Sequence, residues 1–209
     1  MSSLSNLDTR FEAFFSSFFT KFILYAIDGF LIAGAGLLAP IFAVFVEKIG
    51  GSLIEVGVAF SIFSFTAGIG IFVISRLEDV NKKNIKKFVV SGYFLAMIGY
   101  TLYLFANSVA FLYVSQFILG IAAAVRVPSY DVLITKSSPN HLAVAWGNWN
   151  AVAYIVAGST ATIGATIAAI YGFDALILLM STLSAVAFLL SLLLMKSVKT
   201  PEDEVSNPF

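Results

Sequence analysis

Apolar residues follow one another along most of this chain in long stretches, which short polar segments interrupt. The stretches are about 20 residues long, and an α-helix of that length, rising about 1.5 Å per residue, crosses a hydrocarbon core of roughly 30 Å. The expected helices are Phe22–Val46, Leu53–Ser75, Ile85–Ala106, Val109–Thr135, Ala143–Tyr171 and Ala175–Met195. The pattern therefore predicts an all-α membrane protein with six transmembrane helices and no separate soluble domain.

The two ends of the chain differ from this apolar middle. Residues 1–20 carry a stripe of phenylalanines at helical spacing, namely Phe11, Phe14, Phe15, Phe18 and Phe19. A helix with such a face can lie at the cytoplasmic membrane interface, and it can equally be the extended start of the first span. Residues 196–209 are acidic and contain proline, which is typical of a mobile tail. We expect an interfacial segment (1–20), a six-helix domain (21–195) and a cytoplasmic tail (196–209).

Basic residues gather on one side of the predicted bundle. The densest cluster lies in Ser75–Lys87, between the second and third spans, and only Lys48 belongs to a connection on the opposite side. The basic residues on the side of the cluster are Arg10, Lys21, Arg76, Lys82, Lys83, Lys86, Lys87, Lys136, Lys196 and Lys199. Because Lys and Arg flank spans mainly on the cytoplasmic side, we expect both termini in the cytoplasm. The expected location is the inner (plasma) membrane of a bacterium or archaeon.

Two ionisable residues fall inside predicted spans, Asp28 in the first and Arg126 in the fourth. A charge in a span is costly, so it usually faces a partner or a wet cavity. Counted from the cytoplasmic ends of their antiparallel helices, both residues lie within one or two turns of a common depth, so they can pair. Such a pair can bind a substrate or respond to protons, because protonation of Asp28 would free Arg126 for an anion. It can also be a static pair that orients the helices.

Further polar residues mark faces of the fourth and fifth spans. Arg126 and Asp131 lie on either side of the direction of Gln116, at about 100° per residue, so the three form one broad polar sector of the fourth span. The candidates on the fifth span are Asn148, Asn150 and Tyr154. Asn148 and Asn150 either line a gate near the cytoplasmic end or lie at the membrane interface, and Tyr154 follows Asn150 on one stripe of the helix. We include all of them in the expected path of substrate or protons.

The composition argues against several other kinds of chemistry. The sequence has no cysteine and a single histidine, His141 in a polar connection, so it offers no thiol nucleophile, disulfide or histidine cluster for a metal. Clustered carboxylates, paired Asn-Pro-Ala segments and the repeats of mitochondrial carriers are also missing from the sequence. A formal net charge of zero gives no general attraction to nucleic acid. We expect no catalytic residue, no metal and no cofactor, and therefore no enzyme.

Short motifs in a fixed order give the chain a family likeness. Between the second and third spans, six positions match a signature of roughly Gly-x-Leu-x-Asp-Arg-x-Gly-Arg-Arg: Ser75, Leu77, Asp79, Val80, Lys82 and Lys83. The Leu, the Asp and the basic end are kept, whereas both glycines and the first Arg are replaced. In the fourth span, Gly120 and Pro128 match positions of the same family's fourth helix, and Gln116 replaces the Arg expected four residues before the Gly. The chain thus resembles one half of a major facilitator superfamily transporter.

The resemblance implies a secondary active transporter of a small organic solute, with alternating access to a central cavity. Members have two halves related by an axis along the membrane normal, so this chain would form a parallel homodimer in the lipid bilayer. The resemblance also implies a gating loop of Asp79, Lys82 and Lys83, in which Asp79 meets the start of the partner's fifth helix. The loop can instead be a solvated topology signal. The chain itself can instead be a non-transporting scaffold or regulator, or an inert half of a larger transporter.

Overall fold

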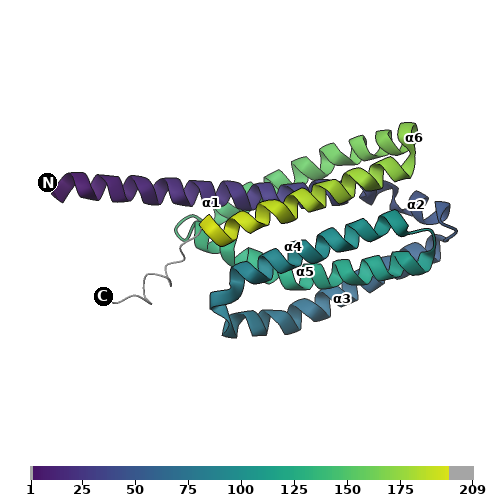
Figure 1. The fold of residues 1–209 in the computed structure, drawn as a ribbon, viewed down its shortest axis with the longest axis horizontal. Coiled ribbons are helices and arrows are strands. Elements are labelled where there is room, and N and C mark those ends of the chain that lie inside the picture. Colours follow the sequence, from purple (N-terminus) through teal and green to yellow (C-terminus); the bar gives the residue numbers. More distant parts are fainter. Residues whose placement is uncertain (1, 198–209) are drawn as a thin grey trace.

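The structure is a computed structural model that describes residues 2–197, all of them in helices or in the short turns between helices. The elements are α1 (Ser2–Leu38), η1 (Ala39–Ile41), α2 (Phe42–Lys48), α3 (Leu53–Val80), η2 (Lys82–Asn84), α4 (Ile85–Leu102), η3 (Tyr103–Phe105), α5 (Val109–Ser137) and α6 (Leu142–Ser197), as Figure 1 shows. Within this described range there is no β-strand, so the all-α prediction is confirmed.

Parts of the sequence predictions lie outside what the structure describes. The side chains of residues 2–18, of Lys82 and of residues 196–197 are not described, and neither are residues 198–209. Most of the expected phenylalanine stripe and nearly all of the expected tail fall in these regions. The interfacial segment and the mobile tail therefore stay predictions.

In the part of the chain that the structure describes, five helical stretches are long and apolar enough to cross a membrane. They are Phe19–Lys48, Leu53–Val80, Ile85–Phe105, Val109–Ser137 and Leu142–Met195. The first stretch combines α1, η1 and α2, because Pro40 lacks a backbone N–H and the helix passes through a 3-10 turn there. The first four stretches match the first four expected spans closely. The last stretch contains both of the remaining ones.

The last stretch turns back on itself at Gly172. Its helical geometry breaks there, with φ 84° and ψ 172°, and glycine adopts a positive φ without strain. α1 contacts residues on both sides of this break. A Cβ on Gly164 would overlap the carbonyl group of Leu37, and a Cβ on Gly34 would lie 3.2 Å from the carbonyl oxygen of Met180. α1 therefore packs against both parts of α6, which are green and yellow in Figure 1.

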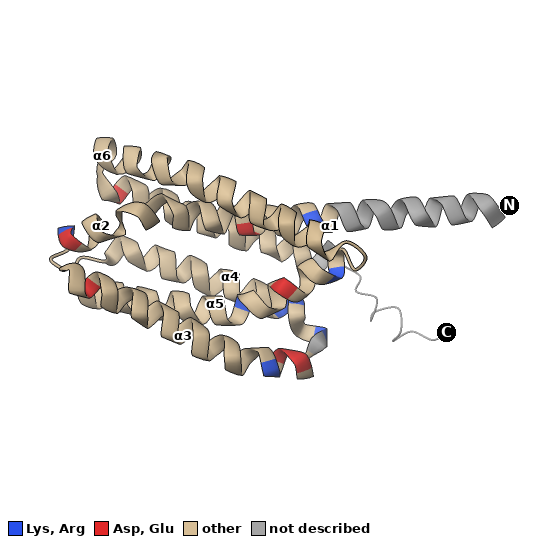
Figure 2. Cartoon of the chain, turned by 180° about the vertical axis from the view of Figure 1, so that it is seen from behind, with Lys and Arg blue, Asp and Glu red and all other residues tan. Residues whose placement is uncertain are grey.

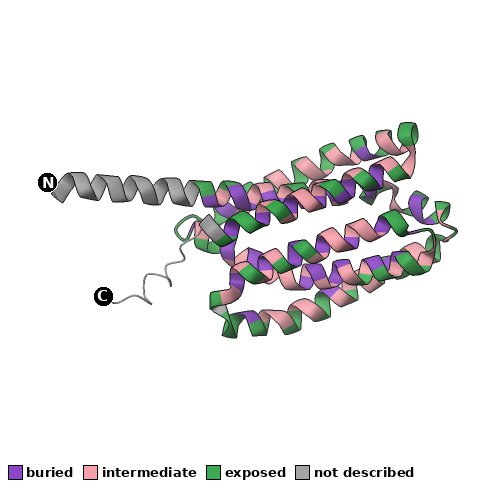
Figure 3. Ribbon diagram, viewed as in Figure 1, coloured by how far each residue is buried: buried purple, intermediate pink, exposed green. Residues whose placement is uncertain are grey.

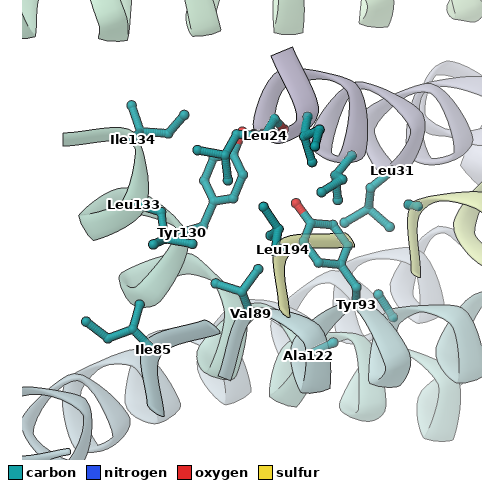
Figure 4. Packing of buried hydrophobic residues seen from close by; sticks show 14 of the residues in the cluster. Leu24, Leu31, Ile85, Val89, Tyr93, Ala122, Tyr130, Leu133, Ile134 and Leu194 are labelled. Atoms are coloured by element: carbon teal, nitrogen blue, oxygen red, sulfur yellow. Dashed lines mark hydrogen bonds between the residues drawn. The ribbon is translucent and has the colours of Figure 1, made fainter. Parts of the chain in front are cut away.

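The bundle is organised around α1 and α5. We call residues 142–171 the first arm of α6 and residues 173–197 the second arm. α1 packs against α6, and α5 packs against both α3 and α4. α4 also lies along the second arm, where the ring centroids of Phe94 and Phe188 are 5.3 Å apart. Buried positions follow these contacts along each helix (Figure 3) and bring α1, α4 and α5 together around one apolar cluster (Figure 4).

The charged segment Ser75–Lys87 is more helical than the sequence led us to expect. We expected the second span to end at Ser75 and a loop to follow, but α3 continues to Val80, and η2 leads directly into α4. Arg, Leu and Glu are good helix formers, and a helix can project beyond the apolar layer into water. The loop prediction was therefore wrong for all but a tight turn near Asn81. Charged residues gather at the two ends of the bundle, as Figure 2 shows.

Candidate functional site

Asp28 on α1 and Arg126 on α5 form an ion pair inside the bundle. Nη1 of Arg126 donates to Oδ1 of Asp28. The side chain of Asp28 is 2% exposed and that of Arg126 is 16% exposed. The pairing expected from their common depth is therefore confirmed. Attraction is strong where water is excluded, and either charge without the other would be costly there.

Two more helices supply donors to the same carboxylate. The hydroxyl of Tyr93 on α4 donates to Oδ1 of Asp28 at 2.9 Å. The indole Nε1–H of Trp149, on the first arm of α6, donates to Oδ2 at 3.0 Å. Hydrogen bonds to an ionised acceptor are stronger than neutral ones, so these donors fix the position of the carboxylate firmly. Asp28 thus joins α1, α4, α5 and α6 at one point.

Aromatic rings surround the guanidinium group of Arg126. Its Cζ lies 5.2 Å from the ring centroid of Tyr93 and 5.9 Å from that of Tyr130, both within the range of cation–π attraction. Tyr130 is fixed in turn, because its hydroxyl donates to the backbone oxygen of Leu24 at 3.0 Å. Figure 4 shows Tyr93 and Tyr130 reaching from α4 and α5 toward α1. The cation therefore has both an opposite charge and electron-rich ring faces around it.

A glycine lets α4 and α5 approach each other at this depth. Gly92 is buried, and a Cβ on it would lie 2.5 Å from Cβ of Arg126 and 2.9 Å from its backbone nitrogen. Those distances are shorter than ordinary carbon contacts, so any side chain at Gly92 would push the helices apart. Tyr93, the next residue, donates to Asp28 from this closely packed part of α4.

Arg126 also borders a small pocket. The pocket has a volume of about 80 Å³, and its lining includes Leu31, Phe63 and Tyr100 besides Arg126. Nε of Arg126 is buried and makes no hydrogen bond within the described residues. A buried donor without an acceptor is unusual and is expected to find a water molecule or a ligand. The pocket offers space for a few water-sized groups beside the ion pair.

The other residues predicted on α5 are not part of the ion pair. The side-chain amide of Gln116 donates to the hydroxyl of Tyr103 on η3 at 3.0 Å, so it is directed toward that residue rather than toward Arg126. Asp131 is partly exposed, and the charged groups that act on it are Arg126 and Asp28. The broad polar sector predicted for this helix is thus split, and Asp131 is its member nearest the pair.

The predicted residues on the first arm of α6 lie apart from Asp28. Asn148 is exposed and borders a groove at the end of the bundle. Asn150 turns its amide onto its own helix, donating to the backbone oxygen of Trp146 at 2.8 Å. Tyr154 is 79% exposed. The structure brings none of the three to the ion pair, so their place on a path stays a prediction.

In the gating segment, Asp79 and Lys83 are exposed, and the side chain of Lys82 lies outside the description. Their neighbour Glu78 was missed by sequence reasoning and is buried, 5% exposed. Its Oε1 has no hydrogen-bond partner within the described residues, and neither has Oγ of Ser129 on α5. No signal in a single sequence distinguishes a buried Glu78 from an exposed Asp79, because the two are adjacent.

The fold and the site together define an integral, multi-pass membrane protein with an ion pair among its helices. A profile of the Major Facilitator Superfamily matches residues 19–208, and the chain belongs to this family. The chain is also similar to an uncharacterized MFS-type transporter of Methanocaldococcus jannaschii, with 25% identity over 152 residues. That match covers 72% of this chain and 39% of the relative, so the chain spans well under half of the relative's length.

Proposed function

We propose that this chain is a secondary active transporter of a small organic solute and that it works as a parallel homodimer. The observation that carries the proposal is the buried Asp28–Arg126 pair in a chain that belongs to a transporter family. Ionisable residues within spans usually mark the path of substrate or protons. A pair kept only for stability would be a poor choice, because apolar residues of similar volume often stabilise a fold as well.

The pair can act as a charge switch. When Asp28 binds a proton, its attraction for Arg126 weakens, and the guanidinium group is free to bind an anionic group of the substrate in the neighbouring pocket. When the proton leaves, Asp28 attracts Arg126 again and competes with the substrate. Tyr93 and Trp149 hold the carboxylate in place in either state, since both donate to it. Asp131 is the second carboxylate that Arg126 acts on.

The homodimer would provide the second half of the transporter. We place six spans in each copy by counting the two arms of α6 separately, with both termini in the cytoplasm of a bacterium or archaeon. Several glycines on spans have open space around them: a Cβ on Gly57, Gly68 or Gly158 would have nothing within 4 Å. Exposed glycines in spans suit close packing of another helix. In this arrangement Asp79, with Lys82 and Lys83, would meet the start of the partner's α6.

The coverage of the relative favours one alternative, in which the chain is one half of a larger assembly. A mass measurement of the purified chain in lipid nanodiscs separates the two ideas. We expect a particle of two copies. A single copy that transports would contradict the homodimer, and a single copy that transports nothing would support the alternative of an inert half.

Transport itself is tested in proteoliposomes that contain a trapped pH-sensitive dye. Amino acids, monosaccharides and monocarboxylates are added one at a time under an imposed proton gradient. We expect at least one solute to change internal pH, and the Asp28→Asn chain to lose this coupling. A wild-type chain that moves neither protons nor any labelled solute of the panel would favour a scaffold or regulator.

A further inference from the structure

We propose that a groove at the end of α1 and the start of α6 binds the phosphate headgroup of an anionic phospholipid. The groove has a volume of about 420 Å³ and is lined by residues of α1, of the turn before α6 and of the first arm of α6. It is separate from the Asp28–Arg126 site, and the proposal does not depend on transport. Figures 1 and 2 show the turn before α6 lying beside α1.

The groove combines several groups that suit a phosphate. Lys21 supplies a cation, and His141 can supply a ring N–H donor. Ser138 is only 8% exposed, yet it lines the groove, and its hydroxyl makes no hydrogen bond within the described residues. Because Ser138 lines the groove, its hydroxyl can donate to a phosphate oxygen bound there. None of the described residues that line the groove is acidic.

The helix geometry adds to this positive character. α6 begins at Leu142, and the backbone N–H groups of its first turn have no acceptor of their own within the helix. Val144 of that turn lines the groove, whereas the N–H of Ala145, which also lines it, already donates to the backbone oxygen of His141 at 3.0 Å. An N-terminal helix end carries a partial positive charge and binds anions readily. The hydroxyl of Tyr25 donates to the backbone oxygen of Ala145 at 2.9 Å and so holds α1 and α6 together beneath the groove.

The position of the groove favours a lipid over a free anion. Lys21 lies two residues inside the first membrane-spanning stretch, which starts at Phe19, and His141 directly precedes the last one. The groove is therefore at the level where headgroups meet acyl chains. Phe22 and Val144 on its rim are 64% and 59% exposed, so they can contact the first carbons of an acyl chain. Basic pockets between spans are typical sites for anionic headgroups.

Native mass spectrometry of the full chain in detergent tests the proposal with three probes. These are dioleoyl phosphatidylglycerol, dioleoyl phosphatidylcholine and inorganic phosphate. We expect phosphatidylglycerol to bind most tightly, and Lys21→Gln and His141→Gln each to weaken it by roughly fivefold, as one lost headgroup contact of about 1 kcal/mol implies. Lys21→Arg should keep the affinity, and Lys87→Gln, which changes an exposed lysine in the first turn of α4, should leave it unchanged.

Three results would overturn the proposal. Equal affinity for the two lipids would show that the groove does not recognise the charge of the headgroup. Unchanged affinity in both the Lys21→Gln and His141→Gln chains would place the lipid elsewhere. Inorganic phosphate that displaces phosphatidylglycerol at equal concentration would mean that an anion alone, not a lipid, occupies the groove. Lys21 and His141 belong to different segments. If one of the two variants fails to fold, the lipid affinity of the other still tests the proposal.

Discussion

The indole N–H of Trp149 donates a hydrogen bond of 3.0 Å to Oδ2 of Asp28, although the two residues are 121 positions apart in the sequence. The other carboxylate oxygen accepts from Tyr93 and Arg126. The carboxylate is therefore held by a neutral ring donor on one side and by a cation and a hydroxyl on the other. Each of these contacts can be removed separately, which allows the role of the site to be tested group by group.

Replacing Asp28 by Asn should destabilise the bundle, because it leaves the charge of Arg126 buried without its counter-charge. Breaking a buried pair in this way costs about 3–5 kcal/mol in soluble proteins. We expect a lower thermal unfolding temperature, measured in detergent with a thiol-independent dye. The Asp28→Asn, Arg126→Gln chain should recover part of the loss, since both charges are then gone. If the double variant lost more stability than the two single variants lose together, this interpretation would be contradicted.

Replacing Trp149 by Phe should remove one donor from Asp28 and keep most of the ring packing. A buried acceptor left without its partner costs about 1–3 kcal/mol, so we expect a smaller loss of stability than for Asp28→Asn. Trp146→Phe is the matched control, because the indole of Trp146 packs edge-on against Trp149 and donates no hydrogen bond within the described residues. Equal unfolding temperatures for the two variants would show that the bond to Asp28 contributes little.

Replacing Gly92 by Ala should separate α4 from α5 at the depth of the ion pair. The added methyl would meet Cβ of Arg126 at 2.5 Å. Alanine favours helix over glycine by about 1 kcal/mol, so a loss of stability here would have to come from the clash. Gly147→Ala provides the control, since a Cβ on Gly147 has nothing within 4 Å. We expect a lower unfolding temperature for the Gly92 variant and an unchanged or higher one for the control.

Replacing Glu78 by Gln should stabilise the contact between α3 and α5. Glu78 is buried with an unpartnered Oε1, and a carboxylate in such a place is disfavoured by the loss of water. The amide is neutral, so its burial costs less than that of a carboxylate. Asp79→Asn, at an exposed position, should leave the free energy of unfolding within about 0.5 kcal/mol of wild type. A less stable Glu78→Gln chain would mean that this carboxylate has a charged partner or is required as an anion.

The sequence predicts the helices and the ion pair because both depend on local information. Span lengths follow from apolar runs, and the common depth of Asp28 and Arg126 follows from the rise per residue. The donors Tyr93 and Trp149 could not be predicted as contacts of Asp28, because they depend on which faces of four helices meet. The extension of α3 to Val80 was missed because the polar residues after Ser75 were interpreted as the end of the helix. Polarity marks the end of the apolar layer instead.

The packing of α1 against α6 also has a consequence for biosynthesis. Asp28 leaves the ribosome before these partners, because Arg126 follows 98 positions later and Trp149 follows 121 positions later. α1 must therefore enter the membrane while its carboxyl group has none of these partners. Insertion of the first span and completion of its contacts are separate events in time. A chain stalled before α6 is made would present Asp28 of α1 without Trp149 to lipid or to the insertion machinery.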